Sequence, residues 1–150
     1  MKLCIIAVLS FVVFQISAAG DKPMGANEYV KFALSLSQKN LKPGTKGQLL
    51  ISLTPKKGIH INLQPPIDLK LEKNPTIVLV GKPELAKVKV DTSEYLDASK
   101  PIKQSFTIAK AAKSGMLTLK GTLTYFYCSD SEGWCSRFKQ LIDLSVTVAR

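Results

Sequence analysis

The segment Leu117-Thr-Leu-Lys-Gly-Thr-Leu-Thr-Tyr-Phe-Tyr127 decides the fold of this chain. Large apolar residues recur at every second position, with threonine or lysine between them, and the apolar members are Leu117, Leu119, Leu123, Tyr125 and Tyr127. A period of two places alternate side chains on opposite faces of a β-strand. The pattern therefore predicts a strand with one buried face, and we expect Tyr125 and Tyr127 to belong to the core.

The same period of two recurs on both sides of this segment. It predicts further strands at residues 30–36, 49–53, 59–63, 67–71, 77–80, 88–90, 106–108 and 142–148. Turn residues such as Lys42-Pro43-Gly44 and Pro65-Pro66 separate them. The longest helix-period stretch is only residues 109–113, and the polar residues 91–101 predict a long loop carrying an exposed pair, Tyr95-Leu96. About seven to nine short strands in one domain predict an all-β, immunoglobulin-like antiparallel β-sandwich.

The start of the chain has the three parts of a secretory signal peptide. Met1-Lys2 supplies a positive charge, residues 3–16 are mostly apolar, and Ser17-Ala18-Ala19 supplies small residues for cleavage. We therefore predict a signal peptide over residues 1–19, a mature domain over 20–150, and a periplasmic location. Because a membrane-spanning helix needs about 20 apolar residues, we expect no transmembrane segment in the mature chain. Cys4 would leave with the signal peptide.

Charge and composition exclude several other classes of function. The formal net charge is +10, but the lysines are scattered evenly, which favours a solvated surface over a nucleic-acid interface. Attraction to anionic lipid or to an acidic partner stays open. His60 is the only histidine and has no cysteine or acidic cluster at ligand spacing, so we expect no metal and no cofactor. The sequence also has no glycine-rich phosphate loop.

Chemistry concentrates in Cys128-Ser-Asp-Ser-Glu-Gly-Trp-Cys135, at the end of the deciding segment. We expect Cys128 to end one strand and Cys135 to open the next, so that the two thiols face each other across a hairpin. Such a pair is either a structural staple or a redox centre. Closing so short a loop stabilises a fold by only about 2–3 kcal/mol, and immunoglobulin-type staples join strands far apart in sequence. This comparison favours a redox pair.

The neighbours of the cysteines indicate how the pair would react. Asp130 and Glu132 disfavour a thiolate, while Arg137 and Lys139 partly offset them. The thiols should be modest nucleophiles, so their disulfide is better suited to attack by a partner's thiolate. Aromatic residues around the pair are expected to shield the sulfurs and to contact a docked partner, and these are Phe126, Trp134 and Phe138.

The segment from Gly115 through Cys128 to Cys135 resembles the N-terminal periplasmic domain of the thiol:disulfide interchange protein DsbD. The segment Gly58-Ile-His-Ile-Asn-Leu63, followed by Pro65-Pro66, is similar to a Gly-Trp-His strand and a proline segment of that family. The resemblance covers nearly the whole mature chain, and the cysteine region is its specific part. This chain has one residue more between its cysteines than the best-known members, and Ser136-Arg137-Phe138 where a proline is common.

The resemblance implies an immunoglobulin-like domain that exchanges thiols and disulfides. Cys128 and Cys135 would accept reducing equivalents from a thioredoxin-like CxxC protein or a membrane thiol reductase. They would pass them to oxidised periplasmic proteins, including cytochrome c maturation factors. An aromatic loop caps the cysteines in the family, and Tyr95 and Leu96 are the most similar positions here. Family members carry further electron-transfer domains, so the expected donor is a separate polypeptide.

A second class of function stays open at this point. In this alternative, the chain is a non-catalytic exported β-sandwich that serves as a binding or adaptor module, and the Cys128–Cys135 disulfide is a local brace.

Overall fold

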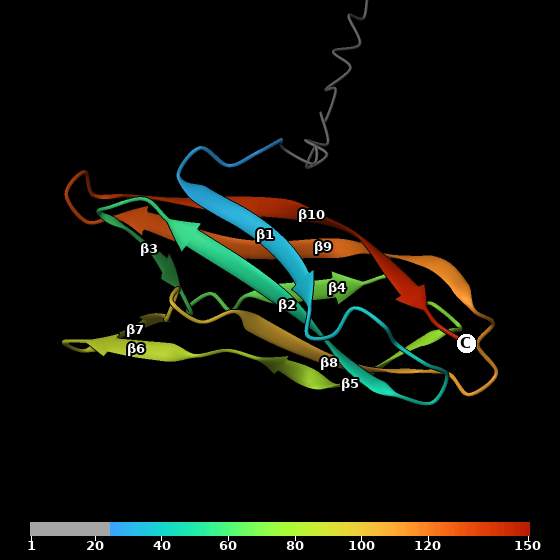
Figure 1. Cartoon of the computed structure of the whole chain (residues 1–150). Helices are drawn as coiled ribbons and strands as arrows, with labels where there is room; N and C mark the ends of the chain where they lie inside the picture. Colours follow the sequence, from blue (N-terminus) through green and yellow to red (C-terminus); the bar gives the residue numbers. More distant parts are fainter. Residues whose placement is uncertain (1–24) are drawn as a thin grey trace, which may run out of the picture.

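The computed structural model describes residues 25–150, in which the segments with period-two patterning form β-strands (Figure 1). The predicted signal peptide and Cys4 lie outside these residues. No helix among the described residues is long and apolar enough to cross a membrane. The strands, in chain order, are β1 (Val30–Leu36), β2 (Lys46–Pro55), β3 (Ile59–Asn62), β4 (Asp68–Leu71), β5 (Ile77–Glu84), β6 (Lys87–Val90), β7 (Ser93–Leu96), β8 (Ile102–Ile108), β9 (Gly115–Ser129) and β10 (Trp134–Val148).

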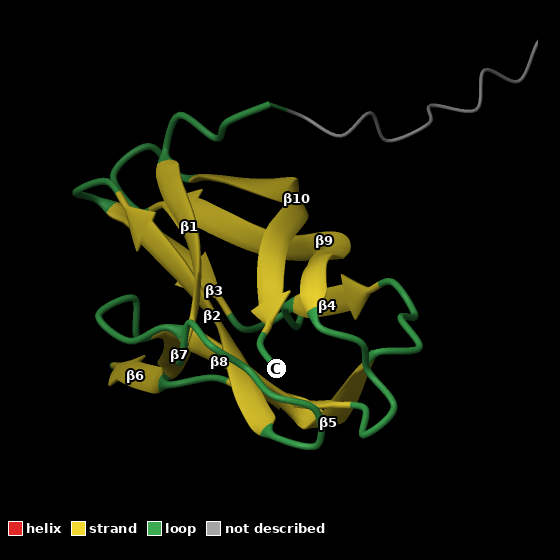
Figure 2. Ribbon diagram, turned by 45° about the vertical axis from the view of Figure 1, so that its right-hand side comes forward, coloured by secondary structure: helices red, strands yellow, loops and turns green. Residues whose placement is uncertain are grey.

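The strands form two antiparallel sheets that face each other (Figure 2). One sheet has four strands in the order β1-β2-β8-β5. The other has six strands and runs β10-β9-β3-β7-β6, with β4 also paired to β9. The predicted all-β fold is confirmed, and the two sheets are consistent with a β-sandwich.

Inward-facing apolar residues of both sheets make one core. In β9 the alternation predicted from sequence holds, since Leu119, Leu123, Tyr125 and Tyr127 are all buried. They meet side chains of the opposite sheet that are equally inaccessible, namely Leu49, Ile51, Ile102, Phe106 and Ile108. The expectation that Tyr125 and Tyr127 are core residues is therefore confirmed.

Two short strands share one flank of the long strand β9. β4 pairs with its middle, where Leu71 faces Gly121, and β3 pairs with its last residues, where His60 faces Cys128. Gly121 permits this approach, because a Cβ atom there would lie 2.3 Å from the backbone oxygen of Lys70. The arrangement places β3 directly beside the first cysteine.

The segment predicted as a long loop contains a strand instead. β7 pairs with β6 and, through Tyr95 opposite Asn62, with β3. Leu96 is only 5% exposed and belongs to the core, so its expected exposure was wrong, whereas Tyr95 is half-buried. The strand has just four residues. Polar residues flank β7 on both sides, so the sequence shows no clear alternation there. One of its partner strands, β3, is distant in the sequence.

Two smaller expectations also need correction. The described chain has ten strands rather than seven to nine, and β5 and β10 extend well beyond the segments predicted for them. Residues 109–113, the longest helix-period stretch, contain a turn in which the amide of Ala112 donates to the carbonyl oxygen of Ala109.

Candidate functional site: the disulfide cleft

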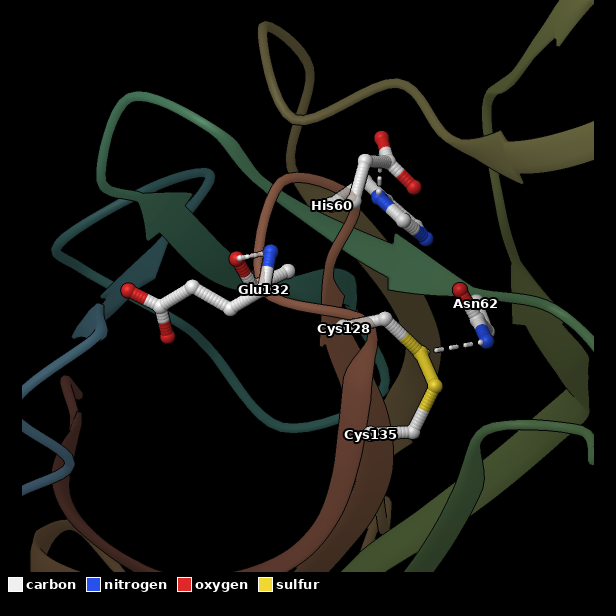
Figure 3. The surroundings of a disulfide bond; sticks show 7 residues. His60, Asn62, Cys128, Glu132 and Cys135 are labelled. Carbon is white, nitrogen blue, oxygen red and sulfur yellow. Dashed lines mark hydrogen bonds and ion pairs between the residues drawn. A yellow bond between two sulfur atoms is a disulfide. The ribbon is translucent and has the colours of Figure 1, made fainter.

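Cys128 and Cys135 form a disulfide at the tip of the β9–β10 hairpin (Figure 3). They are direct partners in the strand register, which confirms that the thiols face each other. Their Cα atoms are 4.1 Å apart, slightly closer than the range of about 4.4–6.8 Å usual for disulfides. Directly opposed residues of antiparallel strands have Cα atoms about 4.5–5.5 Å apart, so the strand pairing by itself already brings the two cysteines close together.

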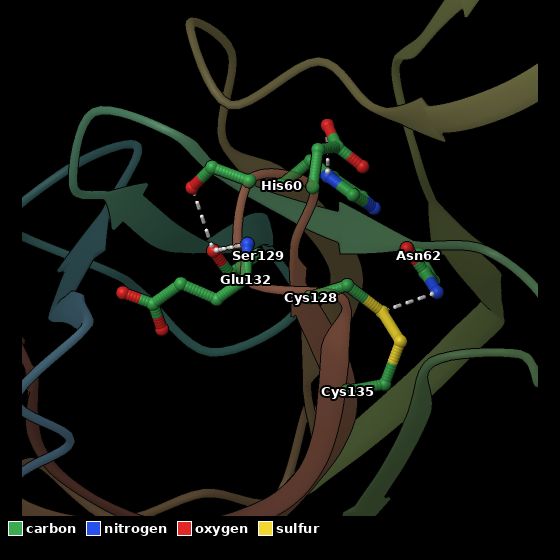
Figure 4. Close-up of polar contacts among 8 residues, drawn as sticks. His60, Asn62, Cys128, Ser129, Glu132 and Cys135 are labelled. Carbon is green, nitrogen blue, oxygen red and sulfur yellow. Dashed lines mark hydrogen bonds and ion pairs between the residues drawn. A yellow bond between two sulfur atoms is a disulfide. The ribbon is translucent and has the colours of Figure 1, made fainter.

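The turn between the cysteines has its own hydrogen bonds. The amide of Gly133 donates to the carbonyl oxygen of Ser129 at 3.0 Å, and the amide of Glu132 donates to Oγ of Ser129 at 3.4 Å (Figure 4). Gly133 has a φ of 69°, which a residue without a Cβ adopts without strain. The hairpin tip is therefore organised by backbone interactions as well as by the disulfide.

The two halves of the disulfide differ in exposure. Cys128 is 5% exposed, whereas Cys135 is an exposed residue. Since a nucleophile must reach the sulfur it attacks, access from solvent favours Cys135. In an exchange reaction at this disulfide, Cys128 would then be the leaving sulfur.

Asn62 contacts the buried sulfur from the neighbouring strand β3. Its Nδ2 lies 3.1 Å from Sγ of Cys128, and Figure 3 shows the amide pointing at the disulfide. Its Oδ1 is buried and has no hydrogen-bond partner among the described residues. The sequence pattern alone does not mark Asn62 as a site residue. Its alternation with His60 put both on one face, but only the pairing of β3 with β9 brings that face to Cys128.

His60 lies beside the cysteine as well, and its environment is polar on one side and aromatic on the other. Its Nδ1 is 3.1 Å from Oδ2 of Asp130, an ion-pair distance, although the contact lacks hydrogen-bond geometry. Its ring centroid is 4.2 Å from that of Tyr95. No group of three or more potential metal ligands occurs within residues 25–150. His60 is a direct neighbour of Cys128 in the strand register.

An open cleft of about 850 Å³ runs along the disulfide. Its lining includes both cysteines together with His60, Asn62, Pro66 and Tyr95. Lys87 and Glu94, which also line it, form an ion pair at 3.1 Å. The cleft thus has both cysteines and Tyr95 in its lining, and Tyr95 is one of the two positions that the resemblance implied as a cap, while Leu96 faces the core.

The three aromatic residues expected at a docking surface take three different positions. Trp134 lines the cleft, packs against the rings of Tyr29 and Tyr127 at 5.0 and 5.8 Å, and donates its indole N–H to Glu132. Phe126 is half-buried, and its register places it on the same face as Cys128. Phe138 is 2% exposed and packs in the core beside Tyr125, so its expected contact with a partner was wrong.

Comparison with known proteins adds no relative to this description. No family model matches the sequence, and no curated protein matches it. The function of the chain is therefore inferred from the geometry of the disulfide and its cleft.

Proposed function

We propose that this protein is an exported thiol-disulfide exchange protein whose reacting pair is Cys128 and Cys135. The observation that carries the proposal is the asymmetric disulfide in an open cleft, with one exposed and one buried cysteine. Exchange proceeds by attack of a thiolate on one sulfur and departure of the other, so a pair with distinct roles suits it.

The first half of the reaction follows from this asymmetry. A thiolate of a thioredoxin-like CxxC protein or a membrane thiol reductase attacks Sγ of Cys135. The Cys128–Cys135 bond breaks, and its electron pair leaves on Sγ of Cys128. The second thiol of the donor then attacks the mixed disulfide and releases Cys135. The donor is oxidised by two electrons, and its two protons end on the cysteines or in solvent.

The second half delivers the same electrons to an acceptor. Cys135, as the exposed thiolate, attacks a disulfide of an oxidised periplasmic protein. Cys128 then attacks Cys135 in the resulting mixed disulfide, reforms the original bond and releases the reduced acceptor. Cytochrome c maturation factors are the acceptor class implied by the resemblance to the DsbD domain.

The alternative role as a structural brace explains less of the geometry. β9 and β10 are already paired along fifteen residues each, and their connecting turn has its own hydrogen bonds. A disulfide added to this hairpin closes a loop of only a few residues and so stabilises the fold by about 2–3 kcal/mol. A local brace in a binding or adaptor module would not need the disulfide to line an open cleft.

Other parts of the proposal concern the surroundings of the pair. The resemblance supports an immunoglobulin-like arrangement of the two sheets, and the signal-like start of the sequence supports a periplasmic location. Tyr95 is proposed as the cap residue because it lines the cleft and packs against His60, which faces Cys128 across the strands. Trp134 and Phe126 are the proposed partner contacts.

The experiment that tests the proposal is the reduction potential of the Cys128–Cys135 pair. The protein is equilibrated with glutathione or dithiothreitol buffers, free thiols are counted, and circular dichroism reports the fold in each state. A potential well above about −300 mV with the fold intact when reduced is the expected result. A lower potential, or a fold lost on reduction, would overturn the proposal in favour of a structural brace.

A further inference from the structure

Asn62 stands out because it is the polar side chain in contact with the less exposed sulfur. Its Nδ2–H donates toward Sγ of Cys128 at 3.1 Å, from the central strand β3 rather than from a loop. A disulfide sulfur is a weak acceptor, whereas a thiolate is a charged and strong one. The same contact therefore strengthens when Cys128 becomes a thiolate.

The other end of the Asn62 amide is also informative. Its Oδ1 is buried and has no hydrogen-bond partner among the described residues. Leaving a buried acceptor unsatisfied costs free energy, so such a group calls for a functional explanation. The carboxamide has one acceptor and one donor end, so a half-turn would let Oδ1 accept from a protonated Cys128 thiol. Asn62 thus has a partner for each protonation state of the reduced cysteine.

We propose that Asn62 is a catalytic residue of the exchange reaction, which stabilises the departing Cys128 thiolate by a hydrogen bond and so selects Cys128 as the leaving sulfur. This inference rests on the proposed function. Attack on Cys135 breaks the S–S bond, the electron pair goes to Sγ of Cys128, and the Nδ2–H of Asn62 faces the charge as it forms. A leaving thiolate that is better stabilised departs faster.

The test uses variants that keep the size of the side chain. Asn62→Leu removes the donor, and Asn62→Asp puts a negative oxygen beside the sulfur. Each is made in a Cys4→Ser, Cys135→Ser background, so that Cys128 is the one free thiol. Asn74→Asp is the matched control, because its Oδ1 accepts from the amides of Thr76 and Ile77 and the new carboxylate keeps that capacity.

The first readout is the pH midpoint of the thiolate ultraviolet absorbance of Cys128. We expect the midpoint to rise by about one pH unit in Asn62→Leu and by more in Asn62→Asp, since a hydrogen bond to a charged group is lost. Asn74→Asp should leave it unchanged. A residue that only holds β3 in place would not move this midpoint while circular dichroism stays native.

The second readout is the rate at which dithiothreitol reduces the intact disulfide in the Cys4→Ser protein. We expect Asn62→Leu to slow it by about three- to tenfold, because the leaving thiolate loses its donor. Unchanged midpoints and rates in the folded Asn62→Asp variant, which has the shape of the native residue, would overturn the inference. The midpoint is measured without any partner. If the reduction potential is as low as that of a structural disulfide but the pH midpoint of Cys128 shifts in the Asn62 variants, the exchange function is rejected and the hydrogen bond is retained. If the potential lies in the range of exchange proteins but the midpoint and the rate do not change, only the role of Asn62 is rejected.

Discussion

Cys128 and Cys135 occupy directly opposed positions on two paired strands, yet one is 5% exposed and the other is open to solvent. The difference comes from their neighbours. β9 is an interior strand of the six-stranded sheet and is flanked at Cys128 by β3. β10 is an edge strand of that sheet, so no further strand covers Cys135. Strand order therefore gives the two cysteines different exposure although they are direct partners in the register.

Single-cysteine variants should reveal this difference directly. In a Cys4→Ser background, Cys128→Ser leaves Cys135 as the free thiol, and Cys135→Ser leaves Cys128. We expect Cys135 to react with an aromatic disulfide reagent at least about tenfold faster than Cys128, because access limits the buried thiol. Equal rates in the folded proteins would contradict the assignment of Cys135 as the attacked sulfur. In denaturant the two rates should converge.

Removing the disulfide should weaken the fold without abolishing it. The double variant Cys128→Ala, Cys135→Ala loses the closure of a short loop, for which the chain-entropy model gives about 2–3 kcal/mol. We expect urea unfolding to remain cooperative with a lower midpoint, and the far-ultraviolet circular dichroism of the native strands to persist. An unfolded double variant would show that the bridge is a staple.

A side chain at position 121 should destabilise the fold. A Cβ atom there would lie 2.3 Å from the backbone oxygen of Lys70 and 2.9 Å from Cα of Leu71, so β4 would have to move. We expect Gly121→Ala to lower the free energy of unfolding by about 1–3 kcal/mol, the usual cost of overpacking. Gly25→Ala is the control, because nothing lies within 4 Å of the Cβ position there. Similar unfolding midpoints for both variants would contradict this account of the β4–β9 contact.

Tyr125 should make the fold sensitive to alkali. Burial raises the pKa of Tyr125 to about 12, although the hydrogen bond that Nδ2 of Asn27 donates to its hydroxyl at 3.1 Å acts in the opposite direction. The folded pKa lies above the ordinary value of 10.0, so the folded state holds the proton more tightly. The contribution of Tyr125 to the free energy of unfolding is therefore constant below about pH 10. It falls between about pH 10 and 12 by about 1.4 kcal/mol per pH unit.

Comparison with Tyr125→Phe isolates this effect, because the two proteins share every other ionisable group. We expect the free energy of unfolding of the native protein, measured with denaturant, to fall relative to that of the variant as the pH rises from 9 to about 11. At neutral pH the variant should be the less stable one, since it leaves the Asn27 donor without its acceptor. Parallel pH profiles would show that the pKa of Tyr125 is the same in the folded and unfolded states and would contradict the prediction.

Much of the architecture could be predicted from the order of the residues. The alternation in β9 predicted which side chains enter the core, and the spacing of Cys128 and Cys135 predicted a disulfide at a hairpin. Both signals are local, because the pleat of a strand fixes side-chain direction within a few residues. The short strand β7 and the burial of Leu96 were missed, since four residues carry too little periodicity.

Only the tertiary structure decided what surrounds the disulfide. Asn62 reaches Cys128 across 66 positions of sequence, and Phe138 enters the core although it lies only three residues from Cys135. The sequence by itself determined that this chain forms strands and where its paired cysteines would meet, because those features depend on neighbouring residues. Which strand flanks each sulfur depends on sheet order, and sheet order arises from long-range pairing and burial that no local pattern encodes.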